Sequence, residues 1–314
     1  MPSKSRHKPK LDLHRLGTEQ SNDHARDLDC LSSLELARII NAEDATVAAA
    51  VTRVLPQIAR AIDLVVAALR KGGRLIYVGA GTSGRIGVLD AAECRPTFNT
   101  DRIQYIIAGG PKALGSDSEV SEDDSKQGRA QMVRRKPTQQ DVVLGIAASG
   151  RTPFTLAALE AARARGAHTI ALTCNPDSPL EHLAHFAIVT QVGPEVLAGS
   201  SRMKSATAHK MVLNMISTAA MSRLGFVHGN LMVNVVPKNE KLKQRALTIL
   251  QRASGKDPDK VRLALEAAGG RTPVALVMLV AGISKAQAVV ALRKSFGHVR
   301  SAITIAKPRQ SSKC

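Results

Sequence analysis

The spacing of apolar residues changes twice along the chain. Between residues 31 and 70, apolar side chains recur every three or four positions, which is the pattern of amphipathic helices. From residue 74 the chain carries short apolar runs of about five residues, the length expected of buried parallel strands. After residue 229 short helical patterns return, separated by Gly or Pro. The pattern therefore predicts strands between two helical regions, at 75–78, 103–108, 142–147, 169–173 and 186–192.

Helical stretches separate the predicted strands, notably 153–165, which begins at a proline, and the long stretch 201–224. Strands that alternate with helices predict an α/β fold, a doubly wound parallel sheet flanked by helices. Short helical segments after the sheet predict a small all-helical C-terminal module, with helices at 240–253, 259–268, 274–280 and 285–294. The chain divides into a basic disordered tail (1–17), an N-terminal helical segment (18–70), a sheet domain (71–228), the helical module (229–306) and a second basic tail (307–314).

The chain of 314 residues is strongly basic, because 44 Lys and Arg against 26 Asp and Glu give a net charge of +18. This charge is compatible with nucleic acid, an anionic membrane or a phosphorylated small molecule as partner. The two tails carry +4 and +3 of it. Aromatic residues make up 2% of the chain, which argues against a stacking platform for single-stranded nucleic acid. The longest apolar run, 274–281, is too short to cross a bilayer, so we expect neither nucleic acid nor a membrane as partner.

The cysteines, at positions 30, 94, 174 and 314, have no paired spacing. They suggest neither a zinc site nor a disulfide framework, and no set of His, Cys and carboxylate residues has metal-ligand spacing. The basic N-terminus leads into no apolar segment of a signal peptide. We therefore expect a cytoplasmic protein with metal-free chemistry.

The segment 79–84, Gly-Ala-Gly-Thr-Ser-Gly, has the G-x-G-x-x-G spacing directly after a predicted strand. A dinucleotide-binding fold needs an acidic residue about 20 positions later to hold the ribose hydroxyls. The next predicted strand ends instead in Ala108-Gly109-Gly110. The sequence thus disfavours a nicotinamide site, and we expect no cofactor.

Two loops of similar sequence follow predicted strands 66 residues apart, Thr-Ser-Gly-Arg at 82–85 and Ala-Ser-Gly-Arg at 148–151. Hydroxyl side chains beside glycines, at the start of a helix, would cradle a phosphate monoester. Serine and glycine also end strands and cap helices for purely structural reasons. Because the loop occurs twice, we favour one ligand held from two sides.

Two groups of carboxylates follow these strands. Asp90 and Glu93 lie after the first loop, in a stretch that reads as too short and too Gly-rich for an ordinary surface helix, so a carboxylate there would face the ligand. Glu93 is a candidate general acid or base, or else a surface charge paired with Arg85 or Arg95. The densest acidic run, 117–124, is on composition a solvated face or the first turn of a helix. If that run follows the second strand, one of its members could reach the ligand crevice.

The start of the long helix at 201–224 is a second candidate anion site. Arg202, Lys204 and His209 lie there, directly after Gly199 and Ser200. On its own spacing, His209 is better explained as a packed or paired side chain than as a catalytic one. No Gly-x-Ser-x-Gly nucleophile motif occurs in the chain.

The segment 79–98, GAGTSGRIGVLDAAECRPTF, strongly resembles the signature of N-acetylmuramic acid 6-phosphate etherases, which the related glucokinase regulatory proteins share. The resemblance covers about residues 18 to 300. Further segments that resemble the family are 18–20 with 28–29, 146–153, 173–179, 199–204, 213–218 and 229–233.

This resemblance implies that residues 71–228 form a sugar isomerase type domain that binds phosphosugars, and that the protein is a homodimer. It implies Glu93 and Glu122 as the two catalytic glutamates, and places Ser83 and Ser149 against the sugar phosphate. The substrate-binding residues so implied are Gly81, Thr82, Ser83, Gly84, Ser149, Gly150, Arg151, Thr152 and Lys204.

The reaction that the resemblance implies cleaves the lactyl ether of N-acetylmuramic acid 6-phosphate, giving N-acetylglucosamine 6-phosphate and D-lactate. Elimination needs a base at C2 and an acid at the ether oxygen, and water then adds at C3. We assign Glu93 as the acid and Glu122 as the base, and leave open that the roles are reversed or shared.

Two other functions remain under consideration. A non-catalytic phosphosugar sensor would resemble the glucokinase regulators, which carry two such domains in a chain about twice as long. A phosphosugar-responsive transcription regulator would use the positive charge, but residues 1–30 contain no evident helix-turn-helix.

Overall fold

The structure of the protein is a computed structural model that describes residues 16–115, 119–235 and 239–307. The predicted tails lie almost wholly outside the described residues, at 1–15 and 308–314. The described chain opens with a buried Leu16 and three short 3-10 helices, η2 (Gly17–Glu19), η3 (Asp23–Ala25) and η4 (Leu28–Cys30).

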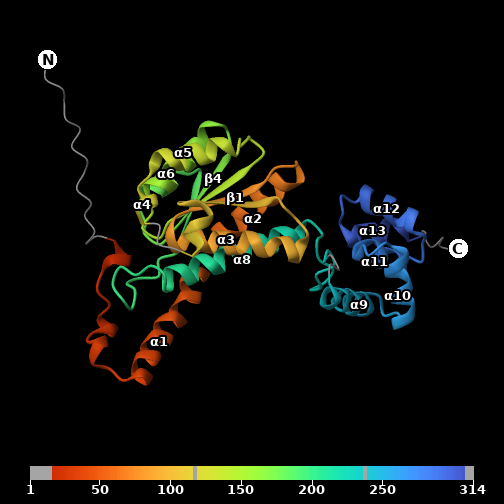
Figure 1. Ribbon diagram of the computed structural model, residues 1–314, viewed down its shortest axis with the longest axis horizontal. Coiled ribbons are helices and arrows are strands. Elements are labelled where there is room, and N and C mark those ends of the chain that lie inside the picture. Colours follow the sequence, from red (N-terminus) through yellow and green to blue (C-terminus); the bar gives the residue numbers. More distant parts are fainter. Residues whose placement is uncertain (1–15, 116–118, 236–238, 308–314) are drawn as a thin grey trace, which may run out of the picture.

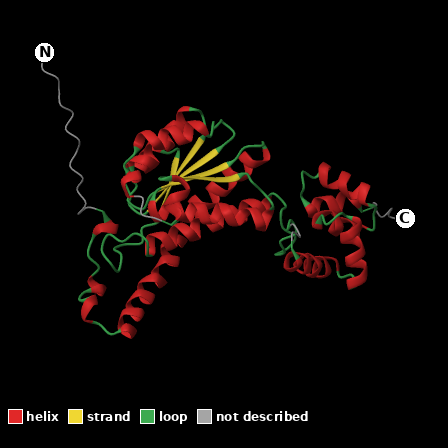
Figure 2. Cartoon of the chain, in the orientation of Figure 1, coloured by secondary structure: helices red, strands yellow, loops and turns green. Residues whose placement is uncertain are grey.

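Five parallel strands form one sheet in the order β2-β1-β3-β4-β5. The sheet is drawn in yellow in Figure 2. They are β1 (Leu75–Gly79), β2 (Ile103–Ile107), β3 (Val142–Ile146), β4 (His168–Thr173) and β5 (Phe186–Val189). In the register, Leu75 of β1 lies beside Ile103 on one side and Val142 on the other. Every residue of β1 and β3 is buried, which explains why these strands appear as continuous apolar runs in the sequence. The predicted α/β fold with a parallel sheet is confirmed.

Helices cover both faces of this sheet (Figure 1). The helices of the sheet-containing part are α1 (Ser33–Thr52), α2 (Leu55–Arg70), α3 (Gly81–Phe98), η5 (Gly110–Leu114), α4 (Glu119–Glu122), α5 (Ser125–Arg134), α6 (Pro153–Ala164), α7 (Pro179–Leu183) and α8 (Lys204–Arg223). α2, α3 and α8 pack on the face that carries Leu75 and Tyr77, and α5, α6 and α7 pack on the face that carries Ile76 and Val78. Successive strand residues point to opposite faces, so the sheet separates two apolar cores.

The stretch after the first loop, which the sequence indicated to be too short and too Gly-rich for an ordinary surface helix, is a regular helix that packs against the sheet. α3 runs from Gly81 to Phe98 without interruption. Its glycines allow the helix to approach the sheet closely: a Cβ atom on Gly87 would lie 3.1 Å from Ile146 Cδ1 and 3.2 Å from Tyr77 Cβ. Packing against the sheet therefore outweighs the low helix propensity of glycine here.

The C-terminal module consists of α9 (Glu240–Ser254), α10 (Pro258–Ala267), α11 (Thr272–Ala281), α12 (Lys285–Lys294) and α13 (Val299–Ala306). The first four match the predicted helices, and α13 adds a fifth. The buried residues of the module form an apolar core separate from those of the sheet, and Figure 1 shows the module beside the sheet. Within the described ranges no single helix is long and apolar enough to cross a membrane. Taken together, α11 and α12 reach the required length and apolar composition, but they are bent by 107° at their junction.

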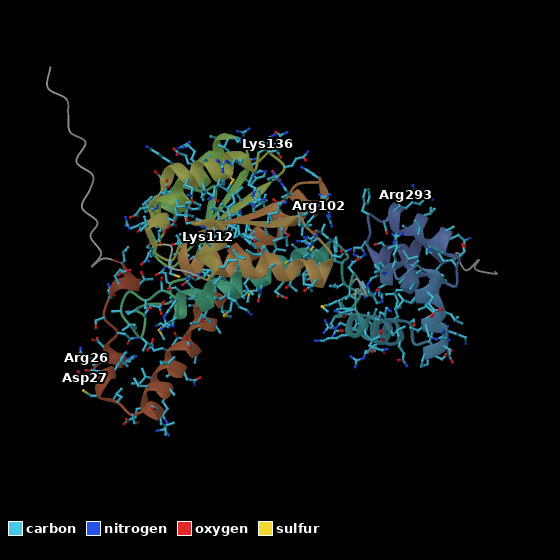
Figure 3. The ribbon with its side chains drawn as sticks, viewed as in Figure 1. Arg26, Asp27, Arg102, Lys112, Lys136 and Arg293 are labelled. Atoms are coloured by element: carbon cyan, nitrogen blue, oxygen red, sulfur yellow. The ribbon has the colours of Figure 1, made fainter. Side chains whose placement is uncertain are left out.

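The excess positive charge is distributed over the whole molecule. Figure 3 labels exposed cations on different parts of it: Arg102, Lys112 and Lys136 around the sheet, and Arg293 on the module. The charge of the protein is thus not confined to the two tails.

Candidate active site

The order of the strands creates one point at which a ligand site is expected. The chain leads from β1 to β2 on one side of the sheet and from β3 to β4 on the other. The carboxyl ends of β1 and β3 therefore flank a topological switch point, where open α/β sheets bind ligands. The two repeated loops follow these two strands, so both 81–84 and 149–152 reach the same edge of the sheet.

The first loop is the N-terminal turn of α3. Gly81 has φ +51°, and its helix directs the N–H groups of its first turn toward the switch point. A Cβ atom on Gly84 would lie 2.8 Å from the carbonyl oxygen of Gly79, so only glycine lets the helix start this close to the strand. This turn has the geometry of an anion cradle.

The second loop is held tightly by its own neighbours. Gly150 has φ +67°, and a Cβ atom there would lie 2.3 Å from Ser178 Oγ. The Gly150 N–H donates to the carbonyl oxygen of Ala147 at 3.0 Å, and the Arg151 N–H donates to Ser149 Oγ at 3.2 Å. The loop then enters α6, which also directs its N-terminus toward the switch point.

Glu122 joins the two loops. The Thr152 hydroxyl donates to Glu122 Oε1 at 2.8 Å, and Glu122 Oε2 lies 3.8 Å from the position that a Cβ atom of Gly81 would take. Within the acidic run, Glu122 is half-buried, Asp123 is exposed, and Asp124 accepts the Gln127 N–H at the start of α5. Asp117 lies outside the described residues. One member of the run, Glu122, therefore lies beside both loops at the switch point.

Glu93 does not reach this place within the same chain. It follows Gly81 by twelve residues on α3, a distance of about 18 Å along a helix. Its exposed side chain lines a separate cavity of about 540 Å³ together with Asp90, Asn214 and Asn230. Among the described residues Glu93 has no ion-pair partner, so the alternative of a salt bridge with Arg85 or Arg95 does not hold.

Asp90 borders the same cavity, but its carboxylate is held by side chains of the protein interior. It is 5% exposed and accepts hydrogen bonds from the Tyr77 hydroxyl at 2.8 Å, Asn214 Nδ2 at 2.6 Å and Ser217 Oγ at 3.0 Å. Burial and the nearby Asp90 charge raise the pKa of the Cys94 thiol to about 12. Asp90 thereby ties β1, α3 and α8 together beneath the cavity that contains Glu93.

The start of α8 is already occupied by groups of the chain itself. The carboxylate of Glu195, fully buried, accepts the N–H groups of Lys204 and Ser205 at 2.8 and 2.9 Å. Lys204 is 2% exposed, and its Nζ donates to Glu43 Oε2 of α1 at 2.5 Å. Although burial acts in the opposite direction, hydrogen bonds from Lys204 and His24 hold the pKa of Glu43 below its usual value. A substrate phosphate would reach Lys204 only if this ion pair opened.

His209 is packed and paired. It is fully buried on α8, with Nδ1 3.4 Å from Ser83 Oγ and Nε2 3.5 Å from Cys174 Sγ. Burial lowers the pKa of His209 to about 4, so the imidazole is neutral near pH 7. It therefore lies directly behind the first loop as an uncharged polar group.

Comparison with known proteins places the chain in a family. The model "Glucokinase regulatory protein N-terminal SIS domain" matches residues 57–163, and the model "SIS domain" matches residues 118–219. A protein of Symbiobacterium thermophilum is 52% identical, over 87% of this chain and 91% of its own length. A protein of Klebsiella aerogenes is 46% identical over 94% and 99%, and one of Streptomyces avermitilis is 46% identical over 98% and 99%. All three are named N-acetylmuramic acid 6-phosphate etherase.

The chain belongs to the N-acetylmuramic acid 6-phosphate etherase family. At the switch point of this chain, the Glu122 carboxylate lies beside both loops, 81–84 and 149–152. Within residues 16–115, 119–235 and 239–307, no group of three or more His, Cys, Asp or Glu side chains is placed to hold a metal ion.

The N-terminal segment packs beside the second loop, a contact that the spacing of the motifs did not predict. Asn175 Nδ2, after β4, donates to Thr18 Oγ1 at 3.0 Å and to the carbonyl oxygen of Ala148 at 2.9 Å. The Gly199 N–H donates to the carbonyl oxygen of Thr18 at 3.2 Å. The resemblance at 18–20 and 173–179 was the available signal, because both motifs meet beside the second loop.

Proposed function

We propose that this chain cleaves the lactyl ether of N-acetylmuramic acid 6-phosphate to N-acetylglucosamine 6-phosphate and D-lactate, as a carbon-oxygen lyase. The single observation that carries the proposal is the Glu122 carboxylate, held by Thr152 between two anion-binding loops at the switch point. Membership of the etherase family supports the same reaction. The reaction belongs to the recycling of cell-wall amino sugars.

The two loops bind the substrate phosphate. N–H groups of the first turn of α3, with the hydroxyls of Thr82 and Ser83, surround it from one side, and the loop 149–152 closes it from the other. A phosphate far from the reacting carbons supplies binding energy that holds the sugar in place for elimination.

The elimination needs carboxylates because an ether is a poor leaving group. The open-chain aldehyde makes the C2 proton acidic, a base removes it, and lactate leaves from C3 as its oxygen is protonated. Water then adds to the double bond, with its oxygen at C3 and a proton at C2. We assign Glu122 as the base and Glu93 as the acid, with the exchanged assignment open. The electrons balance without a redox cofactor, since the sum is a hydrolysis.

A second copy of the chain completes the site. Glu93 lies about 18 Å along α3 from the loop of its own chain, too far to act on a sugar bound there. An apolar groove of about 690 Å³ on α2 and α8, lined by Leu55, Ile62 and Met215 among others, shares Asn214 and Thr218 with the Glu93 cavity. Pairing of two such grooves would bury apolar surface beside Glu93. We therefore propose a homodimer in which Glu93 of each chain serves the loops of the other.

The alternative is a non-catalytic phosphosugar-binding regulator, which would bind the same ligand and release nothing. We further propose a cytoplasmic location, consistent with the free thiols of Cys30, Cys94 and Cys174.

The experiment is lactate release from N-acetylmuramic acid 6-phosphate in oxygen-18 water. We expect lactate from the natural protein, with the label at C3 of the sugar product. Glu93→Gln and Glu122→Gln should each lower kcat by about 10²- to 10⁴-fold while phosphosugar binding persists. The matched control is Asp123→Asn, an exposed neighbour of Glu122, which should leave kcat unchanged. Tight phosphosugar binding by the natural protein without lactate would establish the regulator instead.

A further inference from the structure

A row of buried polar groups ends at the first loop. Cys174 Sγ lies 3.4 Å from Thr190 Oγ1 and 3.5 Å from His209 Nε2, and His209 Nδ1 lies 3.4 Å from Ser83 Oγ. Cys174 is 4% exposed, and Thr190 and His209 are fully buried. The row connects the end of β5 with the turn at which α3 begins.

Every member of this row is uncharged near neutral pH. Burial raises the pKa of the Cys174 thiol to about 11, and the pKa of His209 is lowered to about 4 by the same cause. The thiol and the imidazole therefore each carry one proton. The direction of the hydrogen bonds in the row therefore determines whether Ser83 donates to His209 or accepts from it. The row adds no charge near Ser83.

The available protons allow two hydrogen-bond arrangements along the row, one for each neutral tautomer of His209. The Thr190 hydroxyl donates its single proton to the carbonyl oxygen of Thr173 at 3.3 Å, so it acts only as an acceptor toward Cys174. If the thiol donates to Thr190, or to the buried Ser205 hydroxyl that also interacts with it, its sulfur accepts from His209 Nε2–H, and the bare Nδ1 accepts the Ser83 proton. If the thiol donates to Nε2 instead, Nδ1 carries the proton and donates to Ser83 Oγ.

The two arrangements present different faces of Ser83 to a phosphate. In the first, the only proton of the hydroxyl is used at His209, and its lone pairs would face a phosphate dianion. In the second, Oγ accepts from Nδ1–H, and its own proton is free for a phosphate oxygen. A hydrogen bond to a charged acceptor is stronger than one between neutral groups, so a bound phosphate favours the second arrangement.

We propose that His209 is a positioning residue for the substrate phosphate: in its Nδ1–H tautomer, with Nε2 accepting from Cys174, it donates to Ser83 Oγ and directs the Ser83 proton to the phosphate. The proposal rests on the proposed function, because it places a phosphate at the first loop. Among the residues that the structure describes, the Ser83 hydroxyl has no other hydrogen-bond partner. His209 thus acts on the substrate through Ser83 and does not touch it.

The test is a double-mutant cycle on the affinity for N-acetylglucosamine 6-phosphate, measured by calorimetry. His209→Leu, similar in size but without polar atoms, should weaken binding about five- to tenfold, the effect of one lost hydrogen bond. In a Ser83→Ala background the same change should have no further effect. His209→Asn, whose side-chain amide can still donate, should bind within about threefold of the natural protein.

A tautomer measurement gives a readout that a merely structural role would not move. The imidazole ¹⁵N signals of His209, assigned by their loss in His209→Asn, should show a protonated Nδ1 in the phosphosugar complex. Equal losses from His209→Leu with and without Ser83, or a protonated Nε2 in the complex, would overturn the proposal. Failure of the natural protein to bind the phosphosugar more tightly than unphosphorylated N-acetylglucosamine would instead refute the proposed function.

Discussion

Single buried side chains decide the protonation states around the candidate site. The Asp90 carboxylate receives three donors from β1 and α8, whereas His209 has only weak, neutral partners. A buried charge persists only where such partners offset the loss of water. The Asp90 carboxylate is therefore well hydrogen-bonded in the interior, whereas burial keeps His209 neutral.

Acid should destabilise the fold in part through His209. Burial lowers the pKa of this residue to about 4, from 6.5 in an unfolded chain. Between these values the unfolded state binds a proton that the folded state does not, so the free energy of unfolding falls as the pH drops. The loss amounts to about 2 to 3 kcal/mol at pH 4.5. Between pH 7 and pH 4.5, the free energy of unfolding should fall by that much less in His209→Asn than in the natural protein. Urea unfolding at the two pH values measures both. Equal losses in the two proteins would contradict this account.

Residue types near the site were predictable, but several of their contacts were not. The loops 81–84 and 149–152 could be paired because both follow strands of one parallel sheet. Thr18 and Asn175 are 157 positions apart, and no local pattern indicates that they hydrogen-bond. Lys204 was predicted as a phosphate ligand from its motif, whereas its ion pair with Glu43 depends on how α1 packs against α8.

Among the elements, α1 is attached by an unusual contact. Figure 1 shows this helix extending from the sheet, and four of its residues are buried, Glu43 among them. Its Glu43 forms the buried ion pair with Lys204 at the start of α8. The helix is thus fixed by a paired charge as well as by apolar contacts of Val47 and Val51.

Removing Glu43 should destabilise the protein more than removing the whole pair. Glu43→Ala leaves the Lys204 ammonium buried without a counter-charge, which costs about 3 to 5 kcal/mol in comparable cases. Combining Glu43→Ala with Lys204→Met removes the unpaired charge and should restore most of the lost free energy of unfolding. Urea unfolding measures both variants. A double variant no more stable than Glu43→Ala would show that the ion pair is not what fixes α1.

The predictability of an element depended on whether its pattern was local. The strands were found because buried parallel strands are continuous apolar runs. The length of α3 was underestimated because its glycines lower helix propensity, while the gain from packing Gly87 against the sheet is a tertiary effect. The full length of the helix alone would have placed Glu93 away from the first loop.

At the scale of the whole molecule, one chain holds the parts of the site in two places. Glu122 lies between the two loops that we propose bind the substrate phosphate, and Glu93 lies in the cavity formed with α8 and the segment that follows it. In a dimer with a two-fold axis, both copies use the same surface. If Glu93 of one copy lies at the loops of the second, then Glu93 of the second lies at the loops of the first. The central claim is that the two glutamates act together across this proposed interface.

The most direct measurement of that claim combines two inactive variants. Glu93→Gln and Glu122→Gln chains, co-expressed with different tags, give a heterodimer in which one site keeps both glutamates and the other has neither. We predict that each variant alone releases almost no lactate, and that the purified heterodimer shows about half the kcat of the natural dimer, one intact site of two. A heterodimer as inactive as its parents would contradict the shared site.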